Sequence, residues 1–223
     1  MCHRGRMKLF RREPSADDSL VMVATQRGWR EVAAAAMSML PPSHEIGDPH
    51  DLGSSRPPGC GGRAFAATLP SGAAAQVSHV EIYRNETDEE IYDVVRWRLP
   101  SNNPWGSARF EVLAGADLWG HHRLSGRFGH PGSRKVAAGA GKMRIARAVD
   151  DATVAALVAD PDLALLFELG AQLRNGFVAE LVDGQAAVFS WLALPHRGTE
   201  RWELLVAAAE AFDRLLGRSP SQR

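Results

Sequence analysis

The chain has 223 residues, of which 45% are hydrophobic and 23% charged, and its 26 Lys and Arg residues are balanced by 26 Asp and Glu residues. This composition is typical of one soluble globular domain, or at most two small ones, that folds without a disulfide or a structural metal. Two cysteines, Cys2 and Cys60, exclude a disulfide framework and a zinc knuckle. The longest apolar runs reach about half the length of a membrane-spanning helix, so no membrane span is expected.

Both ends of the chain, residues 1–14 and 218–223, are predicted to be disordered. The N-terminal segment is basic, but polar residues follow it where a secretory signal would need an apolar core. We therefore expect a cytoplasmic protein in which residues 15–217 form a single domain. Met7 begins a plausible shorter chain, so the true start stays open between Met1 and Met7.

The first part of the domain is predicted to contain short helices, a loop rich in proline and glycine, and a β-hairpin. In the hairpin, apolar and polar residues alternate along both strands, and the connection 85–90 is polar and acidic. The predicted elements are, in chain order, helix 15–27, strand 29–32, helix 33–40, loop 43–62, and strands 77–84 and 91–99.

The second part is predicted to end in a hairpin and one amphipathic helix. Asp183-Gly184, between two apolar runs, is a strong signal for a two-residue hairpin turn. The predicted elements are strand 109–113, loop 118–141, strand 142–149, helices 152–159 and 161–169, strands 177–182 and 185–192, and helix 199–217. The last helix is expected to place Trp202, Leu205, Val206, Ala209, Phe212 and Leu216 on one face, with Glu203, Glu210, Asp213 and Arg214 on the other.

These elements predict an α+β fold with a mostly antiparallel sheet of about seven or eight strands, short N-terminal helices and a C-terminal amphipathic helix. Strands and helices do not alternate regularly, which argues against a doubly wound parallel sheet. The closing strand–turn–strand–helix also permits a rolled sheet plugged by the terminal helix, as in pleckstrin-like domains, by analogy of architecture only.

No catalytic motif is complete. The phosphate-loop pattern around Gly141-Lys142 fails because Val136 stands where a glycine is needed and Met143 where a hydroxyl residue is needed. Cys60 is a lone cysteine among glycines, and no serine nucleophile elbow is present. The sequence therefore predicts no catalytic residue and no cofactor.

Residues 118–148 are the strongest candidate for binding, because they contain seven Lys and Arg residues, six glycines and no acidic residue. Guanidinium, ammonium and exposed backbone N–H groups hold phosphate or carboxylate oxygens. The competing interpretation is a solvated loop that faces an acidic patch around Glu81 and Asp93. The candidate binding residues are Arg123, Arg127, Arg134, Lys135 and Lys142, together with Trp105 and Trp119 in loops. The two tryptophans either anchor a partner or cover the edges of the sheet.

Histidines in two loops offer a metal alternative. His50 lies near Asp48 and Asp51, and a second group is His121 and His122. Such side chains are the ligands of a catalytic zinc or similar ion, but no rigid helical spacing is present, and solvated loop histidines are the preferred interpretation.

The order of motifs resembles a known group of proteins. An early Gln-Arg-Gly-Trp (26–29) precedes a proline-rich loop, a hairpin that ends at Arg98-Leu99-Pro100, and the run that starts at Asp150-Asp151. The pattern is similar to a family of uncharacterised actinobacterial proteins and, in its C-terminal part, to a bacterial domain of unknown function often found behind transmembrane helices. This resemblance implies no catalytic residue.

Our first hypothesis from the sequence is a non-enzymatic cytoplasmic module that binds a protein partner or an anionic ligand. The alternatives are a metal-assisted hydrolase that uses the loop histidines, and a nucleic-acid binder that uses the basic segment 118–148. The sequence leaves the oligomeric state open.

Overall fold

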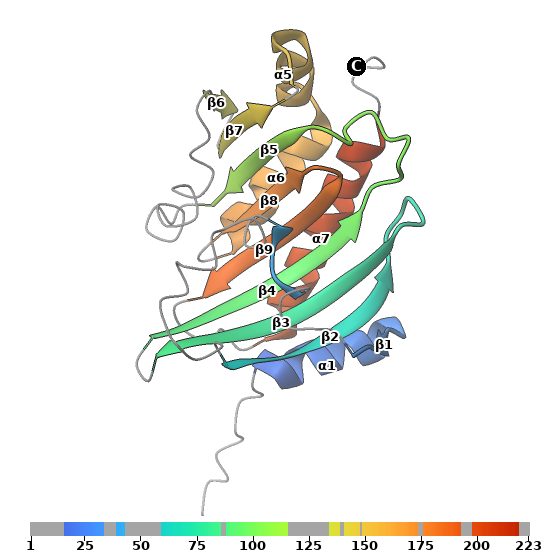
Figure 1. Cartoon of the computed structure of the whole chain (residues 1–223), viewed down its shortest axis with the longest axis vertical. Helices are drawn as coiled ribbons and strands as arrows, with labels where there is room; N and C mark the ends of the chain where they lie inside the picture. Colours follow the sequence, from blue (N-terminus) through green and yellow to red (C-terminus); the bar gives the residue numbers. More distant parts are fainter. Residues whose placement is uncertain are drawn as a thin grey trace, which may run out of the picture.

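The computed structural model describes residues 16–33, 39–42, 59–85, 88–115, 134–138, 141–147, 149–173, 176–192 and 198–218. Within these residues, nine strands form one antiparallel sheet (Figure 1). The strands are β1 (Arg30–Glu31), β2 (Gly59–Thr68), β3 (Ala74–Asn85), β4 (Asp88–Arg98), β5 (Arg109–Ala114), β6 (Arg134–Ala138), β7 (Gly141–Arg147), β8 (Phe177–Val182) and β9 (Gln185–Leu192). The helices are α1 (Ala16–Arg27), α5 (Asp151–Val158), α6 (Pro161–Gln172) and α7 (Thr199–Gly217).

The strand order is β1-β2-β3-β4-β9-β8-β5-β7-β6. The last hairpin of the chain, β8–β9, is therefore inserted between β4 and β5, which are neighbours in sequence. The sheet is open, with β1 and β6 at opposite edges (Figure 1). The predicted α+β class, antiparallel sheet and C-terminal helix are confirmed, while the rolled sheet closed by a terminal helix is not the arrangement observed.

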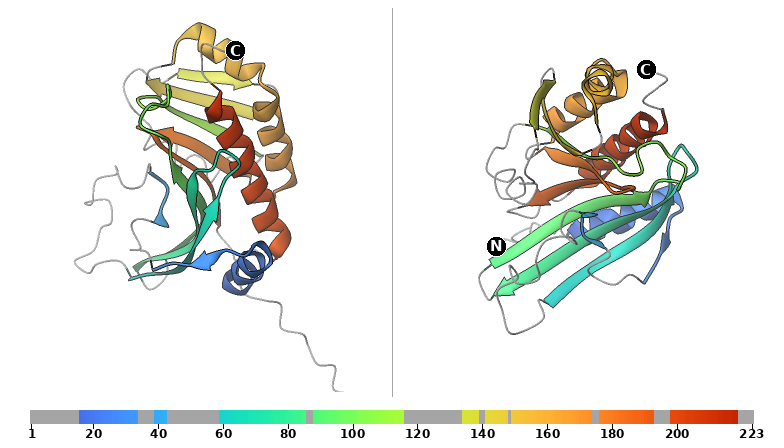
Figure 2. Two further views of the ribbon diagram at one scale, coloured as in Figure 1. Left: turned by 90° about the vertical axis from the view of Figure 1, so that its right-hand side faces the viewer. Right: turned by 45° about the horizontal axis from the view of Figure 1, so that its top comes forward.

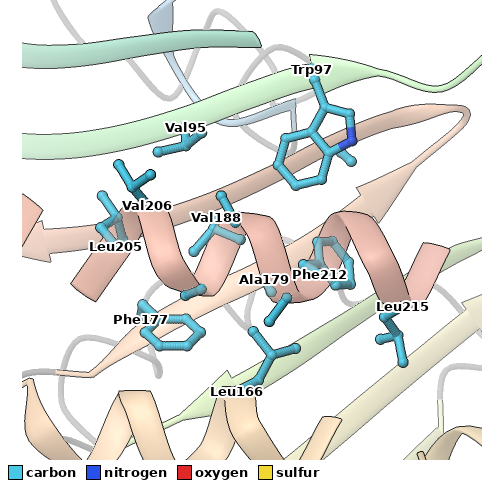
Figure 3. Close-up of a cluster of buried hydrophobic side chains, with 14 of the residues drawn as sticks. Val95, Trp97, Leu166, Phe177, Ala179, Val188, Leu205, Val206, Phe212 and Leu215 are labelled. Carbon is cyan, nitrogen blue, oxygen red and sulfur yellow. The ribbon is translucent and has the colours of Figure 1, made fainter. Parts of the chain in front are cut away.

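Helices α1, α6 and α7 lie on the same face of the sheet (Figure 2). Helix α7 is central, and its six predicted apolar residues are all buried. Figure 3 shows Val95, Trp97 and Val188 of the sheet around Val206 and Phe212 of this helix. Trp97 meets Phe212 edge-to-face at a centroid distance of 5.9 Å, a favourable geometry for two aromatic rings.

The opposite face of the central strands is buried as well. A second apolar cluster on that face includes Val80, Tyr92, Val94 and Phe189, and the segment at Met39 and Leu40 packs against it. Two hydrogen bonds attach this segment, because Met39 O accepts from Ser78 Oγ and Leu40 O accepts from Arg96 Nη1. Burial on both faces explains why five of the six residues of β8 are apolar and do not alternate with polar ones, Glu180 being the exception.

The local signal for the turn between the last two strands is confirmed. Asp183 and Gly184 have φ values of 49° and 78°, as a two-residue turn with both central residues in the left-handed region requires. Asp150 and Asp160 cap α5 and α6, because their side chains accept from the backbone N–H of Thr153 and Asp162. The β8–β9 bounds agree with the predicted strands.

Three expectations need correction. Residues 59–62, expected in a loop, begin the unpredicted strand β2, and residues 134–138 and 141, expected in loop 118–141, belong to β6 and β7. Glycines are accepted in β2 because β3 pairs with it from end to end, and a Cβ at Gly62 would lie 2.1 Å from His79 O. Asp213, expected on the polar face of α7, is buried and accepts hydrogen bonds from Ser71 N and Oγ, both at 2.9 Å.

Other expectations lie outside the described residues, namely the N-terminal segment and most of the helix predicted over 33–40. In the part of the chain that is described, no helix is long and apolar enough to cross a membrane.

Candidate functional site

Three of the residues that the sequence singles out for binding lie on one β-hairpin. Arg134 and Lys135 are on β6 and Lys142 is on β7, and these two strands pair antiparallel. Trp105 is also described and lies elsewhere in the fold. The other candidates lie outside the described residues; these are Trp119, Arg123, Arg127, and the metal candidates His50, His121 and His122 with Asp48 and Asp51. The hairpin is therefore the part of the predicted binding segment whose position in the fold is known.

We call β6–β7 the basic hairpin. It forms one end of the sheet, where β7 pairs with β5 and, among the described strands, β6 pairs with β7 alone. Its two strands contain five basic residues and no acidic residue: Arg134, Lys135, Lys142, Arg144 and Arg147. Lys135 is directly opposite Arg144 in the register, so two positions of like charge are paired across the hairpin.

A single register row continues from the hairpin to two buried carboxylates. Arg144 is opposite Glu111 on β5, and Glu111 is opposite Glu180 on β8. The exposed fractions of Glu111 and Glu180 are 1% and 0%. Arg144 is thus the basic position of the hairpin with an acidic neighbour in register. The register neighbours of the other four basic positions are Ile145, Arg144, Ala137, Leu113 and Arg109.

Trp105 lies in the hydrophobic core and not at an edge of the sheet. Its side chain is 1% exposed, its ring lies edge-to-face with Phe110 at 5.7 Å, and its Nε1 donates to Arg218 O at the end of α7. A tryptophan enclosed in this way fixes the loop after β4 to the last turn of α7. Its burial leaves no surface of the indole for a partner, so the structure does not support Trp105 as a partner anchor.

A second charged region lies inside the fold and was not predicted from the sequence. We call His79, Asp93 and Arg201 the buried charged cluster. His79 on β3 and Asp93 on β4 are opposite each other in register, and His79 Nδ1 donates to Asp93 Oδ1 at 2.6 Å. The other carboxylate oxygen, Oδ2, lies 2.9 Å from Nε of Arg201, in the first turn of α7. His79 and Asp93 are each 1% exposed.

The contact between Asp93 and Arg201 is an ion pair without a well-directed hydrogen bond. Although Nε and Oδ2 are 2.9 Å apart, both atoms are buried and neither has an aligned hydrogen-bond partner, and Arg201 Nη2 is buried without one as well in the described structure. Burial lowers the pKa of Arg201, and the attraction of Asp93 opposes this shift. The pair thus fixes the start of α7 to β4 at a cost in desolvation.

The geometry of this cluster favours a structural role. A carboxylate that orients an imidazole is also part of catalytic triads, but there the second ring nitrogen faces a nucleophile. Here His79 Nε2 faces Glu81 Oε1 at 3.4 Å. Within the described residues, no three His, Cys, Asp or Glu side chains are arranged to hold a metal ion. Among the described residues, the contacts of this cluster are therefore those of a buried network that joins β3, β4 and α7.

Sequence reasoning missed this cluster because its members come from three elements. The alternation of residues indicates that His79 and Asp93 belong to the two strands of one hairpin, but it does not give the register. The connection was expected over 85–90, whereas β3 extends to Asn85 and β4 begins at Asp88. The shorter connection, together with a register shift between Tyr83 and Asn85, places His79 opposite Asp93. No local signal indicates that Arg201 packs against this pair.

No protein-family model, no curated protein and no solved structure matches this chain. The resemblance to actinobacterial proteins stays a prediction, and the function has to be argued from the sites described above.

Proposed function

We propose that this chain is a non-enzymatic cytoplasmic module that binds an anionic protein partner through the basic hairpin. The observation that carries the proposal is the position of five basic residues, without an acidic one, on two paired strands at the edge of the sheet. Four of these positions have no acidic neighbour in register, so the sheet itself supplies little compensating charge there. Complementary charge on a partner gives such a surface specificity and a fast association rate.

A protein fits this surface better than a nucleic acid does. Proteins that bind single strands combine basic residues with aromatic side chains on which the bases stack. The sequences of β6 and β7, RKVAA and GKMRIAR, contain no aromatic residue. The whole chain has a formal net charge of zero, whereas nucleic-acid-binding domains are commonly basic overall. An acidic stretch of polypeptide needs neither stacking nor a basic domain.

The test is a titration of a fluorescein-labelled peptide of alternating Glu and Thr, followed by fluorescence anisotropy. The variant R134E/K135E/K142E reverses three basic positions of the hairpin and keeps Arg144, which faces Glu111. We expect its Kd to rise at least about tenfold, which corresponds to about 1.4 kcal/mol, because attraction becomes repulsion. The wild-type affinity is expected to fall as salt is added.

The matched control is R30E/R63E/R98E, which changes the net charge by the same amount. These three arginines are exposed and lie on β1, β2 and β4, away from the hairpin. The Kd of the control for the peptide is expected to lie within about twofold of the wild-type value, a small loss that reflects the change in net charge. Equal losses in both variants would contradict the proposal, because attraction would then depend on total charge alone.

A labelled oligothymidine provides the comparison with nucleic acid. Tighter binding of oligothymidine than of the acidic peptide, with a logarithmic salt slope that corresponds to several phosphates, would favour the nucleic-acid alternative instead.

A further inference from the structure

The outer edge of β6 has main-chain groups directed away from the sheet. Ala138 and Gly141 are register partners on either side of a two-residue connection, which makes them the hydrogen-bonded pair that closes the hairpin. Pairs alternate along an antiparallel ladder between hydrogen-bonded and non-hydrogen-bonded. The N–H and C=O groups of Lys135 and Ala137 are therefore directed away from β7. Among the described strands, none pairs with this side of β6.

The edge at the other end of the sheet has a different character. There β1 pairs with two residues of β2, Phe65 and Ala66, and Val32 N donates to Ala64 O just beyond them. Its charges are of both signs, with Arg63 Nε 3.8 Å from Glu31 Oε1. An acidic segment would meet a carboxylate at that edge. At β6 the charged positions are Arg134 and Lys135, and the strand has no acidic residue.

Building on the function proposed above, we propose that the acidic segment of the partner is extended and adds to β6 as a further antiparallel or parallel strand. Main-chain hydrogen bonds to Lys135 and Ala137 supply affinity that does not depend on side chains, as in other cases of strand addition. A strand in which acidic residues alternate places all of them on one face of the sheet. Lys135, Arg144 and Lys142 occupy neighbouring register rows of the hairpin, so one register of the added strand aligns its acidic positions with theirs.

Charge at an edge strand also has a protective use, since lysine on an edge discourages pairing between molecules. A single charge or a very short strand is sufficient for that purpose, as the two-residue β1 illustrates. The basic hairpin instead continues its charge onto β7, the strand behind the edge. This second row of basic positions contributes to recognition of acidic side chains and not to blocking of the edge itself.

The experiment compares two labelled peptides with equal numbers of glutamates, a Glu-Thr repeat and a Glu-Pro repeat, on the wild-type chain. Proline cannot donate to a ladder, so the Glu-Pro repeat keeps the charge and loses the strand. We expect the Glu-Pro peptide to bind at least about tenfold more weakly, the effect of losing a few ladder hydrogen bonds. Equal affinity of the two peptides would overturn strand addition and leave the proposed function standing.

Two variants at one position repeat the test from the side of the protein. A137P removes an N–H that is directed outward, whereas A137V keeps it, and neither changes the charge of the hairpin. We expect A137P to bind the Glu-Thr peptide at least about tenfold more weakly and A137V to bind it like the wild type. Amide hydrogen exchange read by NMR on the wild-type chain is a second test, which does not depend on whether the proline variant folds. On peptide binding, Lys135 and Ala137 of the wild type are expected to become protected, and absence of that protection would overturn the proposal.

If neither peptide binds the wild-type chain, the proposed function itself fails, and strand addition fails with it. The two failures are therefore distinguishable. Peptide binding that survives A137P but not R134E/K135E/K142E identifies a purely electrostatic contact, which rejects the strand and keeps the partner.

Discussion

The buried charged cluster and the basic hairpin differ in how their charges are balanced. In the buried charged cluster, an aspartate lies between a histidine and an arginine, with contacts of 2.6 and 2.9 Å inside the core. In the basic hairpin, five residues of one sign share two strands at an edge. The first region compensates its charge within the chain and joins α7 to the sheet. For the second, we propose a role in binding a partner, so the comparison separates a role in stability from a proposed role in binding.

The largest expected effect is a loss of stability in the buried charged cluster. Replacing Asp93 with alanine leaves Arg201 buried without its counter-ion and removes the acceptor of His79. We expect the free energy of unfolding to fall by about 3–5 kcal/mol, as for other buried pairs that lose one partner. Urea denaturation followed by circular dichroism measures this. A loss below about 1 kcal/mol would show that the cluster does not fix α7.

A second, smaller loss is expected at the other end of α7. Asp213 accepts from both N and Oγ of Ser71 in the turn between β2 and β3. The variant D213A is expected to lose about 2 kcal/mol, because hydrogen bonds to a charged acceptor are stronger than neutral ones but Ser71 is exposed and water can replace the carboxylate. The variant D213N, which keeps one acceptor oxygen, is expected to lose less. The same denaturation assay ranks the two.

An exposed ion pair on the same helix is expected to contribute much less to stability than the buried pair. Arg27 of α1 contacts Glu203 and Glu210 of α7, and the hydrogen bond that Arg27 donates to Glu203 raises the pKa of Arg27. The side chains of Arg27 and Glu203 are 33% and 42% exposed, so solvent screens their interaction. We expect E203A to lower the free energy of unfolding by less than about 1 kcal/mol. A loss as large as that of D93A would contradict the distinction between buried and exposed pairs.

The smallest expected effect on stability is that of R134E/K135E/K142E. Because these positions have no acidic neighbour in register, their reversal breaks no pair that the sheet provides. We expect a change within about 0.5 kcal/mol, typical of surface positions, together with the loss of peptide binding described above. A thermal melt of the free protein checks this, and strong destabilisation would mean that the basic residues hold the hairpin in place.

The sequence predicts well the parts of the fold that local signals control. The turn at Asp183-Gly184 and the apolar face of α7 both follow from residue types at fixed spacing. The sequence predicts poorly the strands and buried residues that depend on contacts between distant segments. The strand at 59–68 needs β3 to support its glycines, and β6 has the sequence RKVAA, which shows no alternation. Asp213 is buried because a turn far away in sequence supplies its donors.

The candidate site follows the same division. The basic character of 118–148 is visible from composition, and three of the candidates that it singled out, Arg134, Lys135 and Lys142, lie together on the basic hairpin. Composition does not predict the position of these residues at an edge of the sheet. That position depends on the pairing of β7 with β5, which are distant in the sequence.

The most direct test of the central claim is hydrogen–deuterium exchange of the whole chain, read by mass spectrometry with and without the Glu-Thr peptide. Bound main-chain groups exchange more slowly, so the method shows which edge of the sheet the peptide occupies. We predict slower exchange over residues 134–147 and no change over 59–68 on the opposite edge. Protection at β1–β2, or none at β6–β7, would contradict the assignment of the basic hairpin as the binding surface.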